Sequence, residues 1–306
     1  MNNRLVICAY HNVGYRCLSE LLSQGAEIAL IFTHEDSPTE EIWFESVREL
    51  AQQHGIPCLI SDINDPENVE RLREIAPDFI VSFYYRTMIT PEVLAIPRLG
   101  ALNLHGSYLP KYRGRVPVNW AVINGESETG ATLHYMVEKP DASDIVDQEK
   151  VEIAFTDTAH IVFGKVTAAA VTVIARAWPL LRDGTARRIP MNLADGTYYG
   201  GRKPADGRID WSMSAVQIYN LIRGVTHPYP GAFTSLNGKK VIIWQAWPVE
   251  GVGAPGQAVS QTPLLIGTGH GLLEIRTMQL EGEQEYSAAN FVSTHTPPIT
   301  LFQENS

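Results

Sequence analysis

Asn103 and His105 are separated by one residue at the end of an apolar run, in the stretch LNLHGSYLPKYRGRVPVNW. In a strand this spacing places both side chains on one face, and the glycine after His105 allows close approach to the backbone. A carboxylate can orient a histidine and favour its charged form, so that it moves protons near neutral pH. Asp141, in the loop EKPDASD, is the candidate carboxylate. The Asn103 amide can donate to an oxygen that becomes negative in a tetrahedral intermediate. The three residues therefore suit acyl transfer to an amine, with neither a metal nor a covalent enzyme intermediate.

Other kinds of chemistry lack their sequence motifs. The turn after the first apolar run, AYHNVGYRC, has a single glycine in place of G-x-G-x-x-G, so no NAD site is expected. The sequence contains neither a G-x-x-x-x-G-K-[ST] phosphate loop nor an H-E-x-x-H helix, and its nine histidines are scattered, so we expect no metal. A G-x-S-x-G elbow is absent as well, which disfavours a covalent serine mechanism.

Length and charge narrow the class of protein. The chain has 306 residues, 44% of them hydrophobic, enough to build a substantial core. A formal net charge of −10 argues against a nucleic-acid partner, which usually needs a basic face. The three cysteines match neither a disulfide framework nor a zinc motif. The run LVICAY is too short for a signal peptide, and no stretch approaches the roughly 20 apolar residues of a membrane span. We expect a cytoplasmic globular protein without membrane insertion.

Strands and helices alternate in the part of the chain that must position Asn103 and His105. Apolar runs predict strands at 4–10, 27–34, 56–60, 78–85 and 100–106, and helical periodicity predicts helices at 11–25, 40–55 and 65–77. Asp65 is the expected N-cap of the last of these helices, with Pro66 at its first position. This alternation is typical of a parallel sheet covered on both faces, whose ligands bind beyond the carboxyl ends of the strands.

A second part of different character follows. We expect a short helix at 116–126, two strands within 129–153 and a long helix at 157–184. A Gly-rich segment comes next, followed by one helix and short runs rich in Val, Ile and Trp that are punctuated by turn residues. The predicted fold is α/β, with a Rossmann-like, largely parallel sheet in a catalytic domain at 1–190. Residues 191–211 form a connecting segment, and 212–306 form a small OB-like antiparallel β domain with one helix and a small β barrel.

Four motifs occur in order in the stretch NLHGSYLPKYRGRVPVNWAVINGESETGATLHYMVEKPDASDI. They are N-x-H, S-x-L-P-x-Y-R-G-x-x-P, T-G-x-T and D-A-x-x-I, and in this combination they resemble the folate-dependent formyltransferases. That family transfers a formyl group from 10-formyltetrahydrofolate to an amine. The resemblance implies that Asn103 stabilises the oxyanion, that His105 transfers the proton, and that Asp141 sets the pKa and orientation of His105. One departure is Ser143, where the family usually has glycine.

The same resemblance implies the folate contacts. They are the backbone around Thr87, Met88 and Ile89, the side chain of Arg115, and the loop of Val137, Glu138, Lys139, Pro140 and Asp141. An isolated arginine is usually a solvated charge. Arg115 flanks the catalytic stretch and has anionic ligands to hold, which favours a binding role.

Further segments, including AYHNVG, IFTHEDSPTE, SFYYRTMI and TYYGGRKPADGRIDW, are similar to the enzymes that formylate UDP-4-amino-4-deoxy-L-arabinose for lipid A modification and polymyxin resistance. This implies a UDP-sugar substrate, with Tyr198 and Arg202 as candidate contacts. The main alternative is another nucleotide-linked amino sugar, dTDP- or GDP-linked. Methionyl-tRNA formyltransferase is disfavoured by the acidic charge. A non-catalytic folate- or nucleotide-binding module would lack Asn103, His105 or Asp141, and all three are present.

Overall fold

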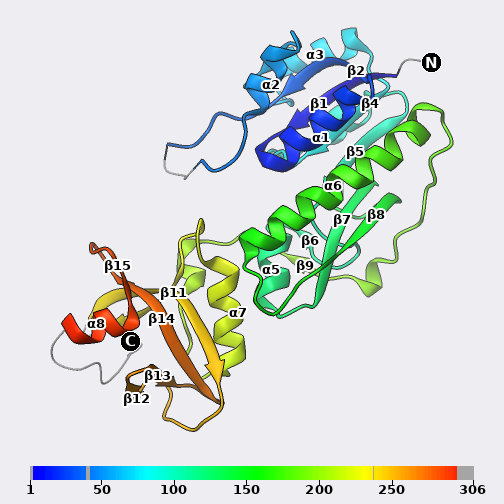
Figure 1. Cartoon of the computed structure of the whole chain (residues 1–306). Coiled ribbons are helices and arrows are strands. Elements are labelled where there is room, and N and C mark those ends of the chain that lie inside the picture. Colours follow the sequence, from blue (N-terminus) through cyan, green and yellow to red (C-terminus); the bar gives the residue numbers. More distant parts are fainter. Residues whose placement is uncertain (1–2, 39–41, 237, 295–306) are drawn as a thin grey trace. The chain divides into compact units, whose positions relative to one another are not determined.

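The apolar runs of the first part of the chain form the strands of one mixed sheet. In the computed structural model, which describes residues 3–38, 42–236 and 238–294, seven strands follow the order β3-β2-β1-β4-β5-β7-β8. Their bounds are β1 Arg4–Ala9, β2 Glu27–Phe32, β3 Cys58–Leu59, β4 Phe79–Phe83, β5 Gly100–His105, β7 Glu128–Tyr135 and β8 Ile145–Glu152. Neighbours from β3 to β5 pair in parallel, whereas β7 and β8 pair antiparallel. The prediction of a largely parallel α/β sheet is confirmed (Figure 1).

The apolar run of the central strand β1 is continuously buried. Residues Leu5 to Ala9 of β1 are all fully buried, as expected for a central parallel strand covered on both faces. The helices are α1 His11–Ser23, α2 Val47–Gln53, α3 Pro66–Ile75, α4 Pro91–Leu94, α5 Pro117–Ile123 and α6 Ala159–Arg182. The Gln24 side chain, at the end of α1, donates to the Ala175 carbonyl of α6, so these two helices cover the same face.

Two of the expected helices begin where their capping residues dictate. Asp65 is the N-cap of α3 and Pro66 its first residue, as predicted. The helix expected from residue 40 begins only at Val47, because the Ser46 side chain accepts from the Glu49 amide and caps α2 there. Residues 42–46 are non-helical instead and carry Phe44 and Glu45.

Helix α6 corrects one expectation. Its 24 residues are long and apolar enough to cross a membrane by length and composition, with a mean hydropathy of 1.5 in the most apolar window. The statement that no stretch approaches a membrane span is therefore wrong. Half of that window is buried inside the protein, and a core helix of a folded domain has the same properties, so one such helix is weak evidence for a span.

The second sheet lies at the end of the chain and is antiparallel. Its strands follow the order β10-β11-β14-β13-β12, with β15 paired to β14. The bounds are β10 Ala232–Leu236, β11 Lys239–Val249, β12 Ala258–Gln261, β13 Leu264–Gly267, β14 Leu272–Leu280 and β15 Glu285–Ser287, with helices α7 Ala215–Val225 and α8 Ala288–Thr294. The expected antiparallel C-terminal domain is confirmed, but it carries two helices, α7 and α8, where one was expected. Its core includes Ile218 and Ile222 of α7 against Ile243 and Ile275 of the sheet.

The chain divides into two compact units that interleave in sequence. The first comprises residues 1–117, 128–152 and 163–200, and the second comprises 118–127, 153–162 and 201–306. A short two-stranded ribbon of β6 (Arg113–Gly114) and β9 (Tyr198–Tyr199) belongs to the first unit. The change of unit after Gly200 falls inside the segment 191–211 that was expected to connect two domains.

Candidate active site

Strand β5 delivers Asn103 and His105 to the junction of the parallel and antiparallel parts of the sheet. On one side β5 pairs with β4, with Ser82 opposite Asn103, and on the other it pairs with β7, with His134 opposite Asn103. His105 is 7% exposed. The prediction that Asn103 and His105 emerge together at a strand end therefore agrees with the structure.

Asp141 meets both of these residues. Its Oδ1 lies 3.4 Å from Asn103 Nδ2 and 3.6 Å from His105 Nδ1, and its Oδ2 accepts from the backbone amide of Gly114 at 2.9 Å. Asp141 has a φ of 49°, in the left-handed region that few non-glycine residues adopt. Such a conformation often marks a functional site. Asn103 and His105 thus converge on the carboxylate of Asp141, as their predicted joint role requires.

The charge of Asp141 is fixed by its neighbours. Burial alone would raise the pKa of this carboxyl, but the charges of His105 and His134, a hydrogen bond from His134 and the Gly114 amide outweigh burial. Together they hold the pKa of Asp141 well below its usual range, so it is an anion across the physiological pH range.

The other side of the His105 ring is held by the backbone. Nε2 lies 2.8 Å from the Tyr112 carbonyl oxygen. Because a carbonyl oxygen can only accept, this contact places a proton on Nε2. The basic nitrogen of neutral His105 is then Nδ1, which faces Asp141. If His105 took a proton, the resulting imidazolium would face a carboxylate, which stabilises the charged form.

His134 was missed by sequence reasoning. Its Nε2 lies 3.3 Å from both Asp141 Oδ1 and Asn103 Nδ2, and its Nδ1 lies 2.7 Å from the Tyr135 carbonyl oxygen. The side chain is 1% exposed. Period-two alternation in the sequence does indicate that Thr132 and His134 share a face of β7. Only the pairing of β7 with β5 shows that this face meets Asn103.

The segment of Thr87, Met88 and Ile89, expected to contact folate, follows β4. Asn64 holds it at two points, with Nδ2 donating to the Met88 carbonyl and Oδ1 accepting from the Thr90 amide, each at 2.9 Å. The Met88 side chain is 63% exposed. The backbone of this segment is therefore fixed while a side chain stays accessible.

A close approach also links Tyr84, the residue after β4, to the end of β5. A Cβ on Gly106 would lie 1.9 Å from the Tyr84 hydroxyl oxygen, so only glycine fits beside this ring.

The remaining predicted residues lie in different places. Arg115 is exposed and follows Gly114, while Val137, Glu138 and Lys139 are exposed in the loop that ends at half-buried Pro140 and Asp141. Tyr198 is 59% exposed in β9, within the first unit.

Arg202 lies in the second unit. Its guanidinium stacks 4.5 Å over the Trp120 ring and donates to the Asp206 carbonyl at 2.8 Å. Burial lowers the pKa of this guanidinium, against the opposing effect of Asp206.

Metal ligation has no support in the described part of the chain, where no group of three or more His, Cys, Asp or Glu side chains is placed to hold a metal ion. The groups that meet here are instead the Asn103 amide, the His105 and His134 imidazoles and the Asp141 carboxylate. These groups can donate to a developing oxyanion and move a proton, which are the two requirements of acyl transfer to an amine.

A mixed α/β sheet with an Asn–His–Asp cluster, followed by an antiparallel β unit, defines an acid–base group-transfer enzyme. The chain belongs to the formyl transferase family. The formyl transferase model matches residues 13–178, and the model of the formyl transferase C-terminal domain matches residues 202–296. The expected family is thereby confirmed.

Solved structures share the fold at low sequence identity. HypX from Aquifex aeolicus matches with a TM-score of 0.64 and 20% identity, over 96% of this chain and 47% of HypX, so the chain spans about half of that protein. WlaRD, a sugar 3N-formyl transferase solved with dTDP and 5-N-formyl-THF, has a TM-score of 0.72 and 18% identity, covering 93% of this chain and all of WlaRD. An N-formyltransferase from Helicobacter canadensis, in complex with folinic acid and dTDP-3-aminofucose, has a TM-score of 0.69 and 18% identity, over 94% and 100% of the two chains.

Proposed function

We propose that this protein transfers the formyl group of 10-formyltetrahydrofolate to the 4-amino group of UDP-4-amino-4-deoxy-L-arabinose. The observation that carries the proposal is the convergence of Asn103 and His105 on Asp141. The folate donor and the amino-sugar acceptor are supported by relatives of the same fold that were solved with folates and dTDP or a dTDP-sugar. The UDP-arabinose substrate and the role in lipid A modification rest on the resemblance of the sequence segments.

The proposed mechanism needs only side chains of this chain. The sugar amine attacks the formyl carbon, and the Asn103 amide donates to the oxygen that becomes negative. His105 takes the amine proton directly or through a water, and Asp141 stabilises the imidazolium. The intermediate then collapses, the bond from the formyl carbon to N10 breaks, and the His105 imidazolium gives its proton to the departing N10 of tetrahydrofolate, directly or through the same water.

One assay tests the acceptor. The purified protein is incubated with 10-formyltetrahydrofolate and UDP-, dTDP- or GDP-linked amino sugars, and tetrahydrofolate release is followed. We expect the UDP-arabinose substrate to be turned over with the highest kcat/KM. Turnover of a dTDP- or GDP-linked sugar alone would contradict the proposed acceptor while leaving formyl transfer intact.

A second assay tests the role of His105. His105→Ala should lower kcat by about a hundredfold or more, since general acid–base catalysis contributes roughly 10² to 10⁴. His54→Ala is the matched control because His54 is an exposed residue at the end of α2. Near wild-type turnover by His105→Ala at saturating substrates would rule out the proton-transfer role.

A further inference from the structure

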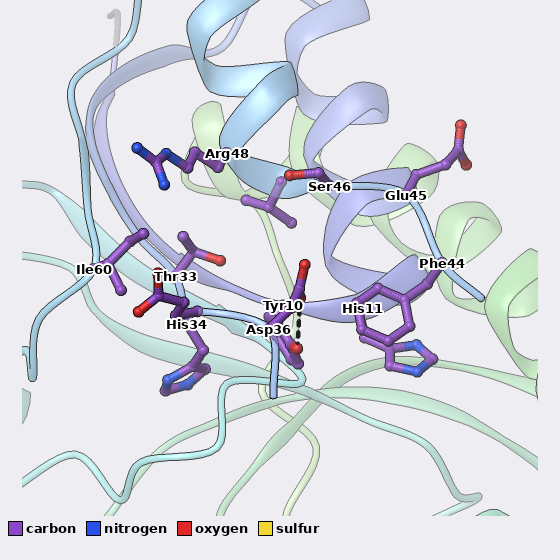
Figure 2. Close-up of a pocket in the computed structure, with 12 residues that line it drawn as sticks. Tyr10, His11, Thr33, His34, Asp36, Phe44, Glu45, Ser46, Arg48 and Ile60 are labelled. Carbon is purple, nitrogen blue, oxygen red and sulfur yellow. Dashed lines mark hydrogen bonds between the residues drawn. The ribbon is translucent and has the colours of Figure 1, made fainter. Parts of the chain in front are cut away.

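A second concave site lies at the carboxyl ends of β1, β2 and β3, on the far side of β4 from the Asn103 cluster in the strand order. It is a cavity of about 320 Å³ within the first unit. Figure 2 shows the side chains around it, which come from the ends of β1 and β2, from the segment before α2 and from Ile60 after β3. The proposed formyl transfer step uses none of these residues.

Aromatic rings form one wall of the cavity. The Tyr10 and Phe44 rings meet edge to face with centroids 5.3 Å apart, and the Tyr10 and His34 rings do so at 5.4 Å. Tyr10 is 3% exposed and its hydroxyl donates to Asp36 Oδ1 at 2.8 Å, so its ring cannot reorient freely (Figure 2). The Arg86 guanidinium lies 4.6 Å from the centroid of the Tyr10 ring, so the half-buried Phe44 ring is the one that a planar nucleobase can pack against.

Oxygen acceptors form the opposite edge. Glu35 and Asp36 follow the end of β2, and both are exposed. Asp36 uses Oδ1 for Tyr10 and has Oδ2 left to accept another donor. Thr33 lines the same cavity and is 2% exposed, and across the described chain no hydrogen bond involves its hydroxyl. In doubly wound sheets a carboxylate at this position accepts from ribose hydroxyls.

Two of the three carboxylates that line the cavity are available to a ligand. Glu45 is ion-paired with Arg16, which leaves Glu35 and Asp36. These two carboxylates can accept hydrogen bonds from hydroxyl groups.

We propose that this cavity binds the nucleoside end of the nucleotide-linked substrate. The base packs against Phe44, the ribose diol donates to Glu35 and Asp36, and the diphosphate and sugar extend out of the cavity. The assignment rests on the proposed function for the presence of a nucleotide, but it concerns a different part of the molecule from the reacting amine.

The assignment has a consequence for substrate choice. A carboxylate that accepts from the ribose 2′-hydroxyl loses that hydrogen bond when the nucleotide is a 2′-deoxynucleotide, and a site built around a hydroxyl discriminates against its absence. The cavity therefore selects ribonucleotides such as UDP over dUDP, and UDP-linked over dTDP-linked sugars. The two relatives solved with dTDP or a dTDP-sugar bind a nucleotide without this hydroxyl.

Calorimetric titration of the full chain with UDP and with dUDP tests the assignment. Wild type should bind UDP about tenfold or more tightly than dUDP. Asp36→Asn and Glu35→Gln should reduce this ratio, whereas Phe44→Leu should weaken both nucleotides alike. Glu27→Gln is the matched control, because Glu27 is an exposed carboxylate at the other end of β2. Unchanged binding of folinic acid shows that each variant is folded.

Three results would overturn the assignment: no binding of UDP by wild type, equal binding of UDP and dUDP, or a ratio that Asp36→Asn and Glu35→Gln leave unchanged. The outcome is separate from that of the turnover assay. Discrimination against dUDP without formylation of any amino sugar would support the cavity assignment and refute the proposed function. Turnover of the UDP-sugar by a protein that binds UDP and dUDP equally would support the proposed function and refute the cavity assignment.

Discussion

Asp141 shares two carboxylate oxygens among four partners, which come from three parts of the chain. Asn103, His105 and His134 surround Oδ1, and the Gly114 amide donates to Oδ2. Removing the charge removes the counter-ion of any imidazolium formed in the reaction, while an amide of the same shape keeps one of the two acceptor oxygens. The role of Asp141 can therefore be tested without a large change of shape.

Asp141→Asn should lower kcat/KM by about a hundredfold or more, because the proton-accepting histidine loses its electrostatic partner. The measurement is tetrahydrofolate release at saturating folate. Asp144→Asn is the control, since in the same loop Asp144 contributes its backbone carbonyl to Tyr135. Equal losses in the two variants would point to a general disturbance of the loop.

The lowered pKa of Asp141 makes a prediction about stability. A depressed carboxyl pKa contributes stability that is present above the usual value of 3.8 and lost as the pH falls below it. The difference in free energy of unfolding between wild type and Asp141→Asn should be constant from about pH 8 to pH 5 and should shrink below about pH 4. Denaturant titrations at each pH measure it. A difference that already shrinks between pH 7 and pH 5 would contradict the shift.

At the scale of elements, the ribbon of β6 and β9 positions the backbone groups that contact His105 and Asp141. Tyr112, just before β6, offers its carbonyl to His105 and stacks on Tyr199 with ring centroids 5.1 Å apart. Gly114 has a φ of 96°, and a Cβ there would lie 2.2 Å from the Tyr199 carbonyl oxygen. Only glycine lets β9 pack here, and this packing places the amide that binds Asp141.

Gly114→Ala should therefore destabilise the protein by about 1–3 kcal/mol and lower kcat/KM by roughly tenfold or more. Gly184→Ala is the matched control, because Gly184 also has a positive φ, of 71°, but a Cβ there meets no atom within 4 Å. Gly184→Ala should lower the free energy of unfolding only because alanine disfavours a positive φ, and it should leave kcat/KM unchanged. Thermal unfolding and steady-state kinetics separate the two effects.

Local patterns account for what could be predicted among the elements, and non-local contacts account for the rest. The apolar runs predicted the parallel strands, and period-two spacing predicted that Asn103 and His105 share a face. His134, Asn64 and His34 were missed because their partners become neighbours only in the folded sheet. His34 Nε2, for example, accepts from the Arg86 amide at 2.9 Å, although β1 lies between β2 and β4 in the sheet.

At the scale of the whole molecule, the second unit is assembled from three stretches of chain. The Asn119 side chain donates to the Gly224 carbonyl at 2.8 Å, and Arg223 donates to the Asp157 carbonyl at 2.9 Å. A Cβ on Gly224 would lie 2.4 Å from Ile123 Cγ1. Helix α7 is thus closely packed against segments whose contacting residues lie 66 and 105 positions earlier in the sequence.

Gly224→Val should cost about 1–3 kcal/mol of unfolding free energy by overpacking against Ile123. Adding Ile123→Ala should recover part of that cost, so the double variant should be more stable than the sum of the two single effects predicts. Gly164→Val in α6 is the control, since a Cβ there meets nothing within 4 Å. Additive costs in denaturant titrations would show that Ile123 and Gly224 are not coupled.

The interleaving of the units limits how relatives of this protein can recombine. A single crossover after Gly200 would join one parent's α7 to the other parent's residues 118–127 and 153–162. Partner pairs such as Asn119 with Gly224 and Asp157 with Arg223 would then have different ancestry. A working chimera must therefore take residues 118–127 and 153–162 from the same parent as the C-terminal sheet. The segments that must be inherited together are thus not contiguous in the gene.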